Sequence, residues 1–106
     1  MDIQTHEQLV TLLESEYRGK EAAILFTQWD TDSEDEEVTQ FRGQLVSVKL
    51  CDNEFGEKDL TLSFEVDEEQ VVEVLMEIPA EEADLGSLAE KRLHIYGTEA
   101  EIVLEA

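Results

Sequence analysis

The chain contains little of what marks secreted, disulfide-linked or membrane proteins. It has one cysteine, Cys51, and one proline among its 106 residues. A single cysteine excludes an intramolecular disulfide, and nothing else in the composition indicates an oxidising compartment. The longest apolar run, 22–26, is far shorter than the roughly 20 residues of a membrane span, and the first residues lack the segments of a secretory signal. We therefore expect a cytoplasmic protein.

Basic residues are the second scarce group. Seven Lys and Arg stand against 28 Asp and Glu, which gives a formal net charge of −21 at pH 7. Nucleic acids and anionic membranes would repel such a chain over a Debye length of about 8 Å at physiological salt. The same charge favours a basic protein partner, a cation or a requirement for solubility. Composition thus argues against direct binding to nucleic acid or membrane.

Hydrophobic residues are abundant enough for a folded core. They make up 42% of the chain and include Trp29, whereas disordered acidic chains lack such residues. Domains commonly have about 100–150 residues, so we expect residues 1–106 to form a single domain. A chain of this length buries roughly two-thirds of its unfolded surface, which is enough for one modest core.

The N-terminal part carries the signals of a helix over about residues 5–18. Thr5 can cap the first turn, and Gln8 stands three residues later, as in a capping box. Gly19 is placed to end the helix, as glycine commonly does. The apolar side chains at helical spacing form one stripe: Leu9, Leu12, Leu13 and Tyr17.

The rest of the chain, residues 22–104, has mainly the patterns of strands. Residues 22–29 are apolar on both faces, which predicts a central strand or one covered by the helix. Residues 38–50 alternate between apolar and polar with a change of phase between Leu45 and Val46. A β-bulge produces such a change, because one extra residue inverts a period of two.

Shorter segments complete the pattern. Residues 59–66 alternate cleanly, and residues 71–78 fit either a strand or a helix face, with β-branched residues that favour the strand. Residues 80–91 predict a short helix or turn. Residues 93–96 and 100–104 predict strands, the last a candidate sheet edge. This order favours an α+β fold, with the N-terminal helix packed on a mostly antiparallel, bent sheet of five to six strands or a small barrel.

An acidic segment, residues 30–37, predicts an exposed loop, because six of its eight residues are acids. Its alternating carboxylates begin like a calcium loop, but Asp35 replaces the required glycine and Phe41 replaces the bidentate glutamate. We therefore expect no metal site there. The acids of the loop are candidate partner-binding residues: Asp30, Asp32, Glu34, Asp35, Glu36 and Glu37.

A second acidic group lies in the strands. Glu65, Glu73 and Glu77 share the outward parity of their segments, and Val71 and Leu75 share the parity of the last two. If these strands are neighbours, apolar side chains lie among carboxylates on one face. That combination is typical of a protein-binding surface, so all five residues are candidate partner-binding residues.

No catalytic signature is present. His6, His94 and Cys51 are far apart in the sequence, and neither a glycine-rich phosphate loop nor a nucleophile elbow occurs. Paired carboxylates carry no information here, because 28 acids bring some pair together in almost any fold. We expect no enzyme activity, no cofactor and no metal.

The leading hypothesis is a small acidic module that docks a basic protein surface. Inhibitors of nucleic-acid-binding proteins that mimic DNA, and immunity-type proteins, belong to this class. Mimicry requires clustered acids, because an even spread gives about one net charge per 290 Å², against roughly one per 100 Å² on DNA. Two alternatives remain: a non-catalytic domain whose acidity serves solubility or salt tolerance, and a chaperone or structural subunit that dimerises through its sheet.

Overall fold

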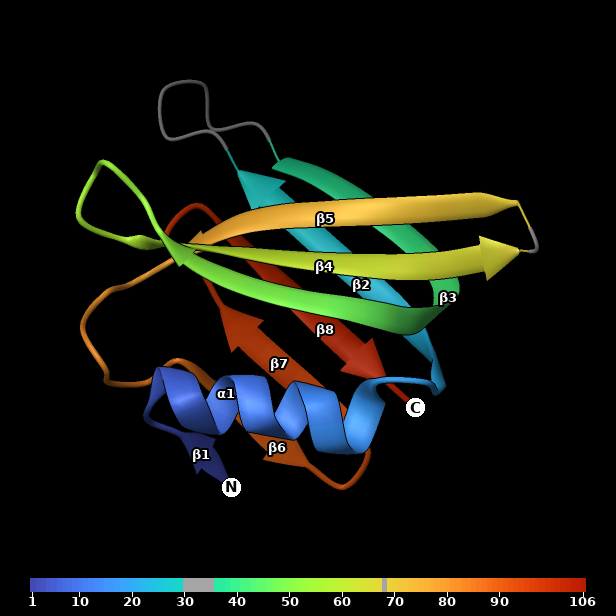
Figure 1. Cartoon of the computed structure of the whole chain (residues 1–106), viewed down its shortest axis with the longest axis horizontal. Helices are drawn as coiled ribbons and strands as arrows, with labels where there is room; N and C mark the ends of the chain where they lie inside the picture. The colour runs from blue at the N-terminus through green and yellow to red at the C-terminus, as the bar shows by residue number, and fades with distance from the viewer. Residues whose placement is uncertain (30–35, 68) are drawn as a thin grey trace.

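The computed structural model describes residues 1–29, 36–67 and 69–106, and over these residues the chain forms one short helical segment and an antiparallel sheet (Figure 1). The α+β class is thus confirmed. The elements are β1 (Asp2–Ile3), α1 (His6–Leu12), η1 (Leu13–Tyr17), β2 (Glu21–Trp29), β3 (Glu36–Asp52), β4 (Lys58–Asp67), β5 (Gln70–Ile78), β6 (Gly86–Ala89), β7 (Arg92–Tyr96) and β8 (Ala100–Glu105).

The sheet has more strands than predicted. Its order over the described residues is β1-β6-β7-β8-β2-β3-β4-β5, eight strands instead of five or six. The two additional strands are β1, with two residues, and β6, with four, both too short to show a period-two pattern. The expected helix or turn over residues 80–91 was therefore wrong in part, because β6 forms within it and pairs with both β1 and β7.

Helix α1 begins where the sequence predicts. The Thr5 hydroxyl accepts a hydrogen bond from the Gln8 N–H at 3.1 Å, and the Gln8 side chain accepts one from the Gln4 N–H at 3.0 Å. The helix continues into the π-helical turn η1, which ends at Tyr17. Leu9 and Leu13 on its apolar stripe are fully buried.

The packing of the helical segment differs from the prediction. It lies along β6 and β7 at one end of the sheet (Figure 1), and its C-terminal end is held between the β6–β7 turn and β3, which are not neighbours in the strand order. The Tyr17 hydroxyl donates to the Lys91 carbonyl beside β7 at 3.1 Å, and the Gly19 N–H donates to the Leu45 carbonyl of β3 at 2.8 Å. Leu9, Leu12 and Leu13 of the helical segment join the core cluster that the sheet encloses.

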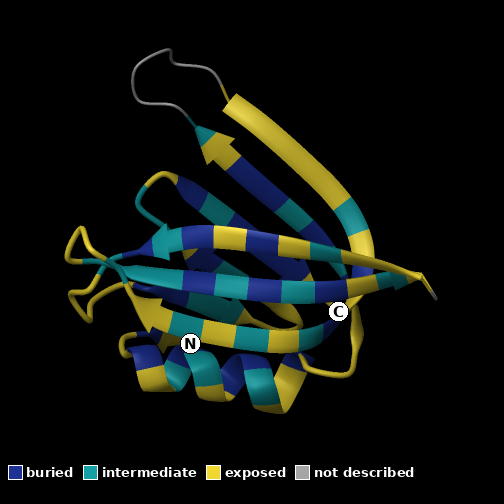
Figure 2. Ribbon diagram, turned by 45° about the horizontal axis from the view of Figure 1, so that its top comes forward, coloured by how far each residue is buried: buried dark blue, intermediate teal, exposed yellow. Residues whose placement is uncertain are grey.

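The long strands follow their sequence patterns. β2 is central, between β8 and β3, as its apolar faces predict. The register of β3 against β4 shifts between Leu45 and Ser47, which confirms the β-bulge. The ambiguous residues 71–78 are strand β5, with Val74 and Met76 buried. In Figure 2, buried and exposed residues alternate along β5.

The edges of the sheet are β1 and β5. Residues 100–104, the predicted edge, lie in β8, which is paired on both sides with β7 and β2, so that prediction was wrong. The sheet remains open, since β5 and β1 do not pair, but β5 curls back toward the β7–β8 turn. There the Thr98 N–H donates to the Glu77 carbonyl at 3.0 Å.

Candidate functional site

Strands β4 and β5 bring the second acidic group together. Their register sets Glu65 opposite Val71, Ser63 opposite Glu73, Thr61 opposite Leu75, and Asp59 opposite Glu77. Because alternate residues of paired strands point to the same side, all of these side chains lie on one outward face. We call this the β4–β5 face: Asp59, Thr61, Ser63, Glu65, Val71, Glu73, Leu75 and Glu77.

Two apolar side chains of this face are exposed. Val71 is 62% and Leu75 is 55% accessible, and Glu73 stands between them on the same strand. The helix leaves them uncovered, because it packs at the β6–β7 side of the curled sheet (Figure 1). The face therefore combines apolar contact area with carboxylates on both sides of it.

One basic residue of β3 borders the β4–β5 face: Lys49, which is exposed and pairs with Thr61. Lys58 is the only basic residue of β4 and β5, and its ammonium group donates to the Asp52 carboxylate. This hydrogen bond and the charge of Lys58 lower the pKa of Asp52 below its usual value. The carboxylates of the face thus have no free basic neighbour on β4 or β5, and Lys49 of β3 lies across the ladder from Thr61.

A pocket of about 350 Å³ adjoins the end of this face. Trp29 and Leu75 supply its apolar wall, and carboxylates of three elements supply its charge. The main-chain N–H of Trp29 donates to the Glu99 carbonyl at 3.1 Å, which holds the end of β2 beside the β7–β8 turn. We call this the Trp29 pocket: Gln28, Trp29, Asp59, Leu75, Met76, Glu77, Glu99 and Ala100.

Electrostatic repulsion is concentrated at Glu77. Burial raises the pKa of its carboxyl above the usual value, and the charges of Glu57, Asp59 and Glu99 raise it further. Within the described ranges, the Oε2 atom of Glu57 is buried with no hydrogen-bond partner. A Lys or Arg side chain entering the Trp29 pocket would meet an indole and several carboxylates, the surroundings that bind such cations.

Sequence reasoning found part of this site only. Glu65, Glu73, Glu77, Val71 and Leu75 lie together as the strand parity predicts. Trp29 and Glu99 were missed as site residues, because no local pattern connects them with β5. The only available signal for Trp29 was its position next to the acidic segment.

The acids of the predicted loop, residues 30–37, do not join the β4–β5 face in the part of the chain that the structure describes. Asp30, Asp32, Glu34 and Asp35 lie outside the described residues. Glu36 and Glu37 were expected in the loop, but they belong to β3 and pair with Trp29 and Gln28. Backbone pairing with β2 extends the ladder into the acidic segment despite the low strand propensity of glutamate. Both glutamates are exposed beside Trp29.

The histidines serve structure. His6 is buried: its Nδ1 lies 3.1 Å from Glu82 Oε1 and its Nε2 lies 2.8 Å from the Pro79 carbonyl. His94 lies 2.8 Å from Glu101 Oε2 and against the Tyr96 ring. Over residues 1–29, 36–67 and 69–106, no group of three His, Cys, Asp or Glu side chains has the geometry of a metal site.

Basic residues gather at the other end of the central strands. One row of cross-strand neighbours contains two of them and runs from β3 to β7: Arg42, Ala23, Glu105 and Arg92. This row lies near the start of β2, whereas Trp29 is the last residue of β2. Three further basic residues lie close to this row, by sequence or around a shared pocket: Arg18, Lys20 and Lys91. The charge is therefore distributed unevenly along β2.

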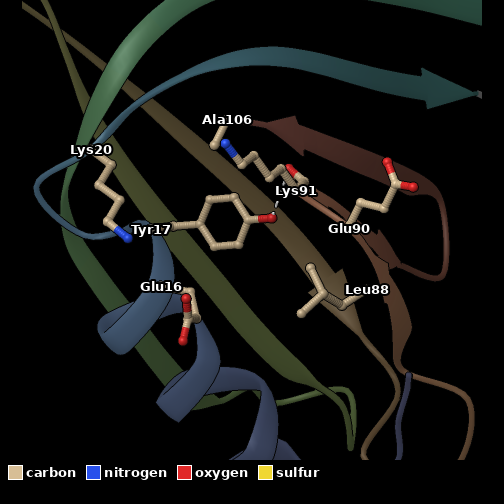
Figure 3. A pocket seen from close by; sticks show the side chains of 7 residues that line it. All are labelled: Glu16, Tyr17, Lys20, Leu88, Glu90, Lys91 and Ala106. Atoms are coloured by element: carbon tan, nitrogen blue, oxygen red, sulfur yellow. Dashed lines mark hydrogen bonds between the residues drawn. The ribbon is translucent and has the colours of Figure 1, made fainter.

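The pocket at this basic end is a packing crevice of about 230 Å³ (Figure 3). The Tyr17 ring lies between η1 and the β6–β7 turn, and its hydroxyl points to the Lys91 backbone (Figure 3). Burial raises the pKa of Tyr17, with a further contribution from the charge of Glu16. Because the hydroxyl is already bonded to the backbone, this crevice serves the docking of η1 on the sheet.

Comparison of the chain with known proteins identified no related protein. The chain matches no protein-family model, no curated protein and no solved structure. Among the described residues, neither helix has the length and apolar character needed to cross a bilayer.

Proposed function

We propose that this protein is a small acidic binding module that docks a basic protein surface through the β4–β5 face. One observation carries the proposal: Val71 and Leu75, both more than half exposed, lie on the same face as Glu65, Glu73 and Glu77. An apolar centre with a charged surround is the usual anatomy of a protein interface.

The two kinds of side chain have different tasks in this proposal. The carboxylates attract a basic partner over several ångströms and accelerate encounter, an effect that salt screens. Val71 and Leu75 supply contact area whose burial strengthens the complex and is less sensitive to salt. The Trp29 pocket accepts one Lys or Arg side chain of the partner against its indole and carboxylates.

The apolar centre also bears on the kind of partner. The accessible surface is 6497 Å², so −21 charges correspond to about one per 310 Å², still sparser than roughly one per 100 Å² on DNA. Val71 and Leu75 have no counterpart on a sugar–phosphate backbone. We therefore favour an immunity-type or inhibitory contact with a basic protein over imitation of DNA phosphates.

The alternative is that acidity serves solubility or salt tolerance. It is favoured by the many acids outside the β4–β5 face, such as Glu7, Glu16 and Glu90, which are exposed. A salt-dependent fold would show a melting temperature that rises steeply into molar KCl. A flat response above about 0.3 M, where screening has relieved self-repulsion, would dispose of this alternative.

The wild-type protein is immobilised on a column, and lysate of the cells that make the protein is passed over it. Three variants are then compared with the wild type. Glu73→Lys with Glu77→Lys reverses the charge of the face, and Val71→Ser with Leu75→Ser removes its apolar centre. Glu7→Lys with Glu81→Lys is the control, because it changes the net charge equally at exposed positions outside the face. A basic protein that the wild type retains above about 0.3 M salt is then purified and titrated against each variant.

We expect both face variants to weaken the purified complex by at least about tenfold, and the control by less than about threefold. The charge reversal should also reduce the dependence of the affinity on salt. Equal affinity of all variants for the partner would show that the β4–β5 face is not the binding surface. Retention of only a broad set of basic proteins, all lost by about 0.3 M salt, would leave the solubility alternative in the lead.

A further inference from the structure

Strand β5 ends the sheet, and its outer side is unpaired over most of its length. The Glu77 carbonyl points away from β4, since it accepts the Thr98 N–H at 3.0 Å. Backbone groups of alternate residues in a strand point to the same side. The N–H and C=O groups of Val71, Glu73 and Leu75 therefore also point away from β4, and within the described residues they have no backbone partner.

This edge is unusual in length and composition. The opposite edge, β1, has two residues, whereas β5 has nine. Long edge strands pair with other chains unless something blocks them, and charges commonly do so. On β5 the blocking charges are Glu73 and Glu77, both negative, so they exclude acidic strands and admit basic ones.

We propose that β5 takes an extended basic segment of a partner protein as an additional antiparallel strand. This inference rests on the proposed function and specifies how the basic partner binds. The segment that fits has apolar residues opposite Val71 and Leu75 and a basic residue opposite Glu73. A second basic residue then lies beside Glu77, at the mouth of the Trp29 pocket.

The charge of β5 argues against a second copy of the chain as the occupant. Two antiparallel β5 strands centred on Leu75 place Glu73 of each copy opposite Glu77 of the other. Like charges directly opposite each other destabilise a strand pair. β5 holds no Lys or Arg, so no register of two β5 strands sets a cation opposite a glutamate.

Backbone pairing is tested with a peptide of sequence Lys-Thr-Ile-Thr-Lys-Thr-Ile. In the proposed register its fifth residue, a lysine, meets Glu73, and its isoleucines meet Leu75 and Val71. Its first lysine extends past Leu75 toward the Glu77 side chain, because the β7–β8 turn already occupies the outer backbone side of Glu77. One derivative is N-methylated at the third and fifth residues, whose N–H groups point to β5. The matched derivative is N-methylated at the second and fourth residues, whose N–H groups point away, and it has the same charge.

We expect the first derivative to bind at least about tenfold more weakly than the second, because it loses two hydrogen bonds. The amides of Val71, Glu73 and Leu75 should become protected from hydrogen exchange when the unmodified peptide binds. On the protein side, Glu73→Pro should bind more weakly than Glu73→Gln. Both remove the same charge, and only proline removes the outward N–H.

Other results overturn the proposal. If both derivatives bind alike, or if the unmodified peptide does not bind at millimolar concentration, strand addition is wrong. The proposed function still stands in that case if charge reversal at Glu73 and Glu77 weakens the complex with the captured basic protein. If the protein alone sediments as a dimer with these amides already protected, the occupant of the edge is a second copy.

Discussion

The main-chain carbonyl of Glu77 accepts a hydrogen bond from the N–H of Thr98 at 3.0 Å. This bond joins the end of β5, the last strand of the sheet, to the turn between β7 and β8. Through it the curled sheet brings Glu99 to Asp59 and Leu75, and the Trp29 pocket forms between them. The geometry of the candidate site thus depends on this closure.

Gly97 is the residue that permits the closure. A Cβ atom there would lie 2.6 Å from the Ala100 carbonyl oxygen and 2.7 Å from that of Glu77. We predict that Gly97→Ala lowers the free energy of unfolding by about 1–3 kcal/mol and accelerates hydrogen exchange at Thr98. Urea denaturation and exchange measured by NMR check this.

Thr98→Ala is the control for that variant. The Thr98 hydroxyl is buried with no hydrogen-bond partner among the described residues, and the backbone bond to Glu77 does not need it. The change should cost less than about 1 kcal/mol. If both variants are equally stable, the close packing at Gly97 is not what holds the turn.

His6 is predicted to be a structural residue. His6→Ala removes a buried ring and its two contacts, to the Pro79 carbonyl at 2.8 Å and to Glu82 at 3.1 Å. The loss should be about 2–3 kcal/mol of unfolding free energy. The control is His94→Ala, which changes a half-buried histidine and should lower the free energy of unfolding by less than about 1 kcal/mol. A larger loss for His94→Ala than for His6→Ala would contradict the structural role of His6.

The pKa of Glu77 predicts a pH dependence of stability. Because the folded state raises this pKa, the carboxyl stabilises the fold below its ordinary titration range, and this contribution is lost as the pH rises through the raised value. Glu77→Gln should therefore melt higher than the wild type at pH 7, and the difference should vanish below about pH 4. Thermal melts at several pH values between these two limits test the sign of the difference in melting temperature. Glu73→Gln, on the same strand, is the control.

The cap at Thr5 gives a smaller prediction. Thr5→Ala removes the hydroxyl that accepts the Gln8 N–H, which should destabilise the protein by about 1 kcal/mol. Thr11 lies exposed in the same helix, and Thr11→Ala should be neutral or slightly stabilising because alanine has the higher helix propensity. Equal effects of the two changes in urea denaturation would mean that the cap contributes nothing.

Local periodicity predicted the parts of the fold that local interactions determine. The cap at Thr5, the bulge after Leu45 and the outward position of Leu75 all follow from residues close in sequence. β1 and β6 could not be predicted, because they are too short for a pattern and exist through pairing with distant strands.

The other contacts that the sequence did not predict have the same cause. The burial of His6 depends on Pro79 and Glu82, more than 70 positions along the chain. The Trp29 pocket requires the curl that brings the end of β2 to the end of β5. Parity along single strands carries no information about either contact.

The most direct test of the central claim is a residue-resolved NMR footprint of the purified basic partner on the isotope-labelled protein. We predict that amide shifts and exchange protection concentrate in β4 and β5, with their maximum between Val71 and Glu77, and reach Trp29. A footprint on α1 or on the Arg42–Arg92 row, with β5 unchanged, would contradict it.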